Sequence, residues 1–346
     1  MESLENNYSK YFERIKLNWD TIAKPLDSLG KLETLVAKLG AIQETEHPSC
    51  LKKCLVVLCS DNGIVEEGIS QSDQSVTRIC AENIATKKTT VGIMAAQVAC
   101  DVFTYDVGIN HPEKIANVID RKIRCGTRNF LKEPAMTKEE VEVALSLGRV
   151  LVSELKSKKY ELICVGEMGI GNTTTSATVA ASLLKVDGKI TAGRGAGLSD
   201  KGLERKITVI NEAINKYDLF NKGPLEVLQT VGGFDLAVMT GIYHAAKEYN
   251  MPVVLDGAIS VTAALVAERI KKGTVDYLIP SHISREPIGK LLCHELNLSP
   301  ILDAHMALGE GTGAVLLLGL LRTAIEVYER SVPFSESNVE QYTRFK

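Results

Sequence analysis

The chain has 346 residues, of which 45% are hydrophobic and 24% are charged, and its formal net charge is −3. This length suits one large α/β domain, alone or with a small appendage, and we expect one main unit. The slight negative charge provides no surplus of cations for a polyanion, which argues against nucleic acid as a partner.

The N-terminal stretch MESLENNYSKYFERIK contains acidic residues and lacks the apolar core of a secretory signal. The longest apolar run, Ala314–Leu321, is too short to cross a bilayer. We therefore expect a soluble, cytoplasmic protein with no membrane segment. The eight cysteines are scattered and form no CxxC pair, which favours reduced, buried thiols.

A helix is predicted over Lys31–Ile42, ahead of six short apolar runs that each end in a polar or glycine turn. Helix-length segments separate the runs, and the one over Lys138–Lys158 opens with a capping box at Thr137. This alternation predicts an α/β fold with a doubly wound, Rossmann-like sheet of six parallel strands. The predicted strands are Leu55–Cys59, Val102–Tyr105, Leu162–Val165, Val253–Leu255, Tyr277–Ile279 and Ile301–Leu302.

A long helical segment, Gly313–Tyr328, follows the last predicted strand. We expect the two chain ends to pack together. The resulting division is a large α/β catalytic domain over residues 50–312 and a small helical domain built from residues 1–49 and 313–346.

Polar side chains lie at or just after the C-terminal end of each predicted strand. In doubly wound sheets, ligands bind outside this edge. We therefore predict the active site there. The residues concerned are Asp61, Asp106, Glu167, Asp256, Ser281 and Asp303.

The stretch GEMGIGNTTT, residues 166–175, resembles the phosphate loop of a nucleotide triphosphatase, but Asn172 stands where that loop has its lysine. A helix that begins near Thr173 would present the N–H groups of Gly169, Gly171 and Asn172 to an anion. Without the lysine, the loop suits a single phosphate. The alternative interpretation is a plain glycine turn.

A second glycine loop spans residues 193–197 and adds the backbone of Gly195, Ala196 and Gly197 as phosphate-binding candidates. Arg194, in the same loop, is either a phosphate ligand or a surface charge. A GxGxxG loop after the first strand, the dinucleotide-binding pattern, is absent.

A third glycine stretch, GEGTGA at Gly309–Ala314, opens the C-terminal helix and contains Glu310. A glutamate at a helix start can merely stabilise the helix dipole. Glu310 and Glu167 are both flanked by glycines, however, which lets a ligand approach their carboxylates closely. The six histidines show no ligand-like spacing, so we expect no metal.

Seven motifs, taken together, resemble the nicotinate-nucleotide:5,6-dimethylbenzimidazole phosphoribosyltransferases of cobamide lower-ligand activation. The likeness runs from Pro25 to the C-terminal helix. The motifs are GEMGIGNTT, DNG with EEG and a serine at Asp61–Ser70, GRGAGLSD, GGFDLAVMTG, PVVLDG, YLIPSHIS and LGEGTGA.

The resemblance implies that nicotinate mononucleotide and an aromatic acceptor give the acceptor's α-ribotide phosphate and nicotinate, with no cofactor. It implies Glu310 as the general base on the acceptor and Glu167 as a second catalytic carboxylate. It also implies that the glycine loops hold the phosphate, that Ser284 lies near the nicotinate, and that the protein is a dimer.

The acceptor end departs from the family's usual pattern, because Asn62, Cys80 and Ala258 replace a histidine, a glutamine and a phenylalanine, while Ser72 keeps the matching serine. We expect these residues and Leu308 to line the acceptor pocket. These changes make the wall of the acceptor pocket more apolar, so the acceptor is either dimethylbenzimidazole or a phenol such as p-cresol. The dimer is either homomeric or mixed. Rival interpretations are a non-catalytic nucleotide-binding subunit and a nicotinamide-dependent dehydrogenase.

Overall fold

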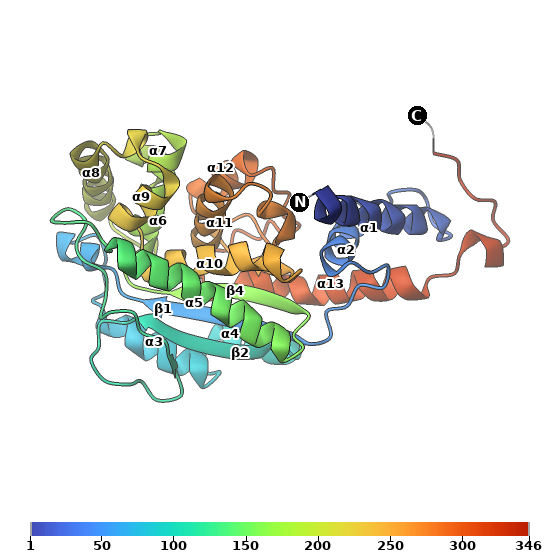
Figure 1. Cartoon of the computed structure of the whole chain (residues 1–346), viewed down its shortest axis with the longest axis horizontal. Coiled ribbons are helices and arrows are strands. Elements are labelled where there is room, and N and C mark those ends of the chain that lie inside the picture. Colours follow the sequence, from blue (N-terminus) through green and yellow to red (C-terminus); the bar gives the residue numbers. More distant parts are fainter. Residues whose placement is uncertain (1, 345–346) are drawn as a thin grey trace.

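The computed structural model describes residues 2–344, with residues 2–6 as backbone only, and contains a six-stranded sheet in the order β3-β2-β1-β4-β5-β6. Every strand pair is parallel. The order reverses direction between β1 and β4, which confirms the doubly wound α/β fold (Figure 1). The strands are β1 Lys53–Ser60, β2 Asp101–Gly108, β3 Ile119–Asp120, β4 Leu162–Met168, β5 Val253–Leu255 and β6 Leu278–Pro280.

Helices cover both faces of the sheet. The chain passes from β1 to β2 through α3 and α4 and returns from β3 to β4 through α5, so right-handed crossovers place these helices on opposite faces. Helix α10 packs on α5, and α13 packs on α4. The helices are α1 Glu2–Thr21, α2 Lys31–Gln43, α3 Ser75–Ala85, α4 Thr90–Gln97, α5 Lys138–Ser157, α6 Asn172–Leu184, α7 Gly188–Thr191, α8 Asp200–Tyr217, α9 Pro224–Val231, α10 Phe234–Glu248, α11 Ala258–Ile270, α12 Ile288–Glu295 and α13 Thr312–Arg330.

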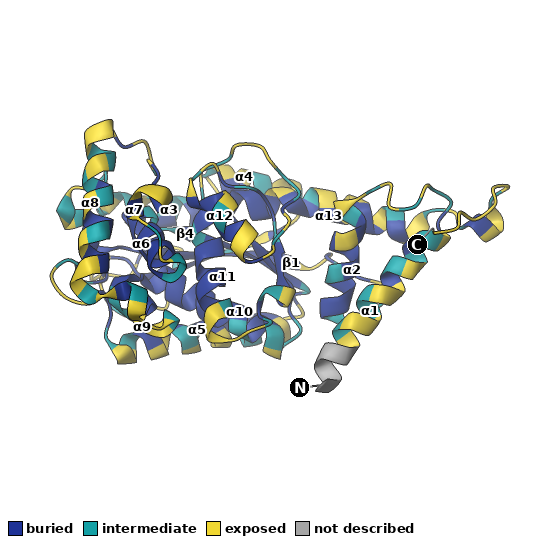
Figure 2. Ribbon diagram, turned by 90° about the horizontal axis from the view of Figure 1, so that it is seen from above, coloured by how far each residue is buried: buried dark blue, intermediate teal, exposed yellow. Residues whose placement is uncertain are grey.

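The central strand β1 is buried along its whole length, and Figure 2 shows the buried core continuing through β4 and α11. Its sequence, KCLVVLCS, is an almost continuous apolar run because helices cover both of its faces. The predicted capping box of α5 is also confirmed, since the Thr137 hydroxyl accepts from the Glu140 N–H and the Glu140 carboxylate accepts from the Thr137 N–H.

One predicted strand is wrong and one strand was missed. Residues Ile301–Leu302 form only an isolated bridge, between Leu302 and His282, because the chain turns outward immediately at the exposed Asp303. The sixth strand is instead β3, which has two residues and pairs with Tyr105 and Asp106 at the edge of the sheet. Such a short, half-exposed strand leaves no apolar run for the sequence to reveal.

The two ends of the chain meet beside the sheet. Trp19 on α1 is fully buried, and its ring packs against Tyr328 of α13 with 5.0 Å between centroids. Helix α13 contacts α4 and β4 as well as α2, so it links the sheet to the N-terminal helices (Figure 1). The two-domain division remains a prediction, and residues 1, 345 and 346 of the predicted small domain lie outside the described residues.

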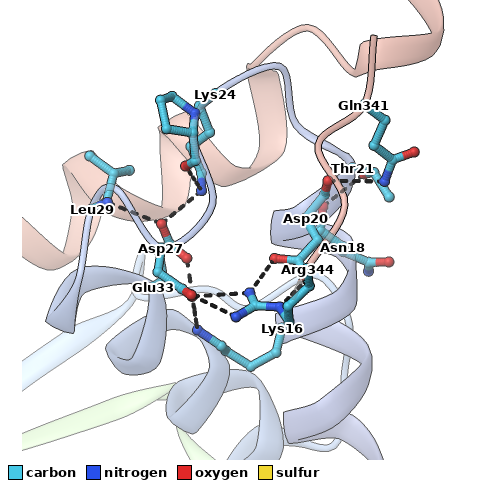
Figure 3. A network of polar contacts seen from close by, with 11 residues as sticks. Lys16, Asn18, Asp20, Thr21, Lys24, Asp27, Leu29, Glu33, Gln341 and Arg344 are labelled. Carbon is cyan, nitrogen blue, oxygen red and sulfur yellow. Dashed lines mark hydrogen bonds and ion pairs between the residues drawn. The ribbon is translucent and has the colours of Figure 1, made fainter. Parts of the chain in front are cut away.

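The C-terminal segment folds back over α1 and the turn before α2 (Figure 3). The Arg344 guanidinium binds the carboxylates of Asp20, at 2.8 Å, and Asp27, at 2.6 Å. Beneath them, the fully buried Glu33 accepts a hydrogen bond of 2.7 Å from Lys24. Among the described residues, no helix is both long enough and apolar enough to cross a membrane.

Candidate active site

A cavity of about 230 Å³ opens at the carboxyl ends of β4, β5 and β6, at the edge that the sequence predicts. Its lining includes four titratable side chains, those of Glu167, Asp256, His282 and Glu286. A larger, more open cavity adjoins it and shares Gly195, Ala196, Glu286 and Ala307 with it. The full lining of the first is Glu167, Met168, Gly169, Ile170, Asn172, Thr173, Gly195, Ala196, Asp256, Gly257, Ala258, Ile259, Ser260, His282, Ser284, Glu286, Ala307, Leu308 and Gly309.

The two glycine-flanked glutamates meet through their backbones, because the Glu310 N–H donates to the Glu167 carbonyl at 3.2 Å. Glycines permit this approach: a Cβ on Gly166 would lie 2.5 Å from the Glu310 carbonyl, and one on Gly309 would lie 2.6 Å from the Glu167 carboxylate. The two side chains diverge from there. Glu167 lines the cavity, whereas Glu310 lies on the side of Cys80 and Thr89.

Glu167 is 7% exposed and is the next-to-last residue of β4. Its carboxylate accepts a short hydrogen bond from the side-chain amide of Asn172. Burial, and then the negative charges of Asp235 and Asp256, raise the pKa of the Glu167 carboxyl well above its usual range. At the position where a phosphate loop has its lysine, Asn172 therefore holds the Glu167 carboxylate at the cavity wall.

Glu310 precedes α13 and adopts φ +61°, in the left-handed region. Its Oε2 atom is buried and has no hydrogen-bond partner among the described residues. Burial raises the pKa of Glu310, an effect that the nearby Thr89 hydroxyl opposes and the charge of Asp256 reinforces. A buried, unpartnered carboxylate oxygen with a raised pKa is suited to accept a proton from a bound molecule.

Asp256 fixes the segment that carries Glu310. This buried carboxylate accepts hydrogen bonds from the N–H groups of Gly311, at 3.0 Å, and Gly313, at 2.7 Å, in the first turn of α13. Burial raises the pKa of Asp256, and the neighbouring His282 and these N–H donors partly offset that rise. His282 fills the space above Gly313, where a Cβ would lie 1.9 Å from its Nδ1.

The first glycine loop, which contains Gly169 and Gly171, packs against the end of β1 and the turn that follows it. Gly171 has φ +93° at the start of α6, and a Cβ on Gly169 would lie 2.1 Å from the Ser60 carbonyl, so neither position accepts a larger residue without movement. The Asn172 N–H donates to the Gly169 carbonyl at 3.2 Å. This N–H therefore closes the turn, and the expectation that it faces an anion stays a prediction.

A buried lysine supplies the cation that the loop lacks. Lys206 on α8 is 0% exposed, and its ammonium donates to the Thr173 hydroxyl at 2.9 Å and to the Gly193 carbonyl at 3.0 Å. It therefore joins the first glycine loop to the second. Burial lowers the pKa of Lys206 to about 8, and Glu286 opposes that change. At neutral pH the ammonium carries its charge beside both loops.

Arg194 takes a different position from that of Lys206. Its guanidinium pairs with Asp200 and also donates to the Leu198 carbonyl at 2.8 Å, which closes the second glycine loop on itself. Its side chain is 51% exposed. Of the two interpretations that the sequence left open, this geometry favours a surface ion pair.

A family model described as "Phosphoribosyltransferase" matches residues 5–339. The chain belongs to this family. It is 42% identical over 323 residues to the nicotinate-nucleotide–dimethylbenzimidazole phosphoribosyltransferase of Ruminiclostridium cellulolyticum, covering 93% of this chain and 92% of the relative. The same enzyme of Acetivibrio thermocellus is 37% identical over 342 residues, 99% of this chain and 97% of the relative.

A crystal structure of a phosphoribosyltransferase with the same name from Thermus thermophilus has the same fold. It superposes with a TM-score of 0.89 at 36% identity, covering 96% of this chain and 99% of the other. The comparisons confirm the resemblance that the motifs indicate and the fold class with it.

Most of the predicted site residues of this phosphoribosyltransferase come together. Nine line the first cavity, Arg194 and Gly197 line the adjoining one, and Gly171 lines a small cavity on the other side of the glycine loop. The nine are Glu167, Gly169, Asn172, Thr173, Gly195, Ala196, Ala258, Ser284 and Leu308.

Four predicted residues line none of these three cavities. Asn62 is fully buried under the glycine loop, where it accepts from the Thr175 hydroxyl at 2.9 Å. Cys80 is half-buried on α3, and burial together with the charge of Glu310 raises the pKa of its thiol, so it lies beside that carboxylate. Ser72 is half-buried in the loop before α3. Glu310 itself faces the same side as Cys80.

Sequence reasoning missed Lys206 because the lysine comes from a helix that follows the second loop. A usable signal was present. Lys206 lies four residues before Ile210 and seven before Ala213, on the stripe of α8 that is otherwise buried and apolar. Among the described residues, no group of three or more His, Cys, Asp or Glu side chains is arranged to hold a metal ion.

Proposed function

We propose that this phosphoribosyltransferase transfers the 5-phosphoribosyl group of nicotinate mononucleotide to an aromatic acceptor, giving the acceptor's α-ribotide phosphate and nicotinate, as a step of cobalamin biosynthesis. One observation carries the proposal. The cavity is lined by both glycine loops and by the Glu167 carboxylate, and behind the loops the buried Lys206 ammonium donates to the Thr173 hydroxyl and the Gly193 carbonyl. A nucleotide with one phosphate and a cationic base suits a cavity that these groups surround.

Each residue then has a defined task. The Lys206 ammonium and the loop backbone hold the phosphate, remote from the bond that breaks. As nicotinate leaves, positive charge moves from the pyridinium ring to the ribose, and the Glu167 carboxylate stabilises it there. Glu310 takes the proton from the incoming acceptor. Ser284 on the cavity wall is the proposed contact for nicotinate.

For the acceptor we propose dimethylbenzimidazole, as in the named relatives, with phenol or p-cresol as the alternative. Cys80 supports the alternative, because a half-buried thiol beside Glu310 offers a small, weakly polar wall to a one-ring nucleophile. An ordinary phenol has a pKa of about 10, so Glu310 would remove its proton within the transition state rather than before it.

Product analysis tests both points. The enzyme is supplied with nicotinate mononucleotide and equal concentrations of dimethylbenzimidazole, adenine, phenol and p-cresol, and the products are identified by mass spectrometry. A benzimidazole ribotide is the expected main product, and an O-ribotide would assign the phenolic acceptor. No ribotide from any acceptor, with folded protein, would refute the proposed activity.

We propose a dimer as the working form and a cytoplasmic location, with the two small-molecule substrates as the only ligands and no cofactor. Sedimentation of the purified chain distinguishes a homodimer from a monomer that awaits a homologous partner. A chain that sediments as a monomer and becomes active only with a second, homologous subunit would assign the mixed dimer.

A further inference from the structure

Asp235 is a fully buried carboxylate to which the proposed mechanism gives no task. It lies in the first turn of α10, after Gly232-Gly233-Phe234, and is 0% exposed. It does not line the cavity. Its Oδ1 accepts from the Leu236 N–H at 2.9 Å, which leaves Oδ2 directed at another partner.

That partner is Asn172, which connects Asp235 to the cavity wall. The side-chain amide nitrogen of Asn172 donates to Glu167 Oε2 and, at 3.4 Å, to Asp235 Oδ2. A carboxamide has two N–H donors, and each of them is directed at a different carboxyl group. The three side chains form one buried relay from α10 to the cavity.

Two buried carboxyl groups joined through one neutral amide do not both carry charge at low cost. Burial raises the pKa of Asp235 to about 6, and the charge of Asp235 in turn helps to raise the pKa of Glu167. Further acidic groups face this pair. Asp256 after β5 and Glu310 before α13 act on Glu167. Cys59 on β1 lies within the field of both carboxylates, and Asp61 lies within the field of Asp235. The free site therefore retains a proton on the Glu167–Asp235 pair.

We propose that Asp235 is a positioning residue that makes the site selective for a cationic pyridinium: it holds a proton on Glu167, through Asn172, until the ring cation of the nucleotide replaces that proton. In this step the O–H bond of the Glu167 carboxyl breaks and the proton passes to solvent, while no other bond changes. The inference rests on the proposed function, since it takes nicotinate mononucleotide as the ligand.

Calorimetry in two buffers of different protonation enthalpy counts the protons that leave when a ligand binds. Nicotinate mononucleotide is titrated into the full-length enzyme, with ribose 5-phosphate as the control because it has the phosphate but no ring cation. We expect the nucleotide to release about one proton more than ribose 5-phosphate at neutral pH. Equal proton counts for two ligands that both bind would overturn the proposal, and this measurement needs no variant.

The variant Asp235→Asn removes the charge and keeps an oxygen for the relay. The extra proton release should disappear, and the acid limb of the kcat/KM profile should move down by about one pH unit or more, because Glu167 then ionises more easily. A merely structural role would lower kcat/KM at every pH without moving the limb. Asp120→Asn, a surface change on β3, is the matched control and should leave both readouts unchanged.

The outcomes separate the two proposals. Suppose that the enzyme binds the nucleotide normally and turns it over, that Asp235→Asn leaves the acid limb of the kcat/KM profile where it was, and that neither protein releases an extra proton. These results would refute the role of Asp235 and leave the proposed transferase activity intact. Failure of folded wild-type enzyme to bind or to use the nucleotide would remove both.

Discussion

The ammonium of Lys206 lies 2.9 Å from the hydroxyl of Thr173. Thr173 belongs to the loop that resembles a phosphate loop without its lysine, and Lys206 reaches it from the first half of α8, 33 residues further along the chain. Cation and loop thus meet in space although they are separate in sequence. We propose that this single ammonium, shared between two loops, serves one phosphate group rather than a polyphosphate.

Replacing Lys206 by methionine should weaken nucleotide binding. The change keeps the side-chain volume and removes a buried charged donor worth about 1.5–3 kcal/mol, so KM for nicotinate mononucleotide should rise about 10-fold to 100-fold. Lys201→Met on the exposed side of the same helix is the control. Steady-state kinetics with varied nucleotide measure the effect, and an unchanged KM would exclude Lys206 as the phosphate ligand.

The pH dependence of kcat/KM should show the deprotonation of Lys206. Since the pKa of Lys206 is lowered to about 8, the free enzyme loses this ammonium as the pH rises through about 8, and kcat/KM for the nucleotide should fall there. Well below pH 8 Lys206 is fully charged, so this group causes no fall in kcat/KM at acid pH. In Lys206→Met the alkaline limb should be absent, and a limb that persists would have to come from another group.

Glu310→Gln should affect chemistry rather than binding. If Glu310 is the base, kcat should fall by about two to four orders of magnitude, while calorimetry should show the nucleotide still binding, because Glu310 is not among the residues that line the cavity. Glu326→Gln, in the second half of α13, is the control and should have normal turnover. Near-normal turnover of Glu310→Gln itself would refute the assignment.

Two glycines of α13, Gly313 and Gly319, differ in the space around them, so the same substitution to alanine should have different effects at the two positions. In Gly313→Ala the new Cβ would lie 1.9 Å from His282 Nδ1, so the cavity wall has to shift, and kcat/KM should fall about 100-fold. In Gly319→Ala the nearest atom is 4.0 Å away, and the helix should gain about 0.5–1 kcal/mol of stability. Denaturant unfolding and kinetics on both variants test this, and equal effects would contradict the packing argument.

Much of the fold follows from the sequence because its strong elements are local. The runs that form β1 and β4 are apolar along their length, and the capping box at Thr137 marks the start of α5. The errors lie where pairing is non-local. Ile119–Asp120 becomes a strand only because β2 offers it a free edge, whereas Ile301–Leu302 makes one bridge to His282, just after the edge strand β6, before the chain turns away.

The site divides in the same way. Glycine flanks identify Glu167 and Glu310, but only the folded chain shows that their backbones touch while their side chains face different spaces. Asn62, predicted at the acceptor, is buried under the glycine loop because the turn after β1 folds inward beneath α6. Lys206 could not be predicted from the sequence of the loops, because it lies on α8, which follows them in the chain.

The meeting of the chain ends has a consequence for synthesis. Asn18 on α1 hydrogen-bonds Tyr328 across a sequence separation of 310 residues, and Trp19 packs on the same ring. At about 5–20 residues per second, a ribosome needs on the order of 15–60 s to make α13 after α1 has emerged. For that interval α13 is not there to cover the faces of α1 and α2 that pack on it, so these two helices complete their native packing only after the C-terminal helix has been made.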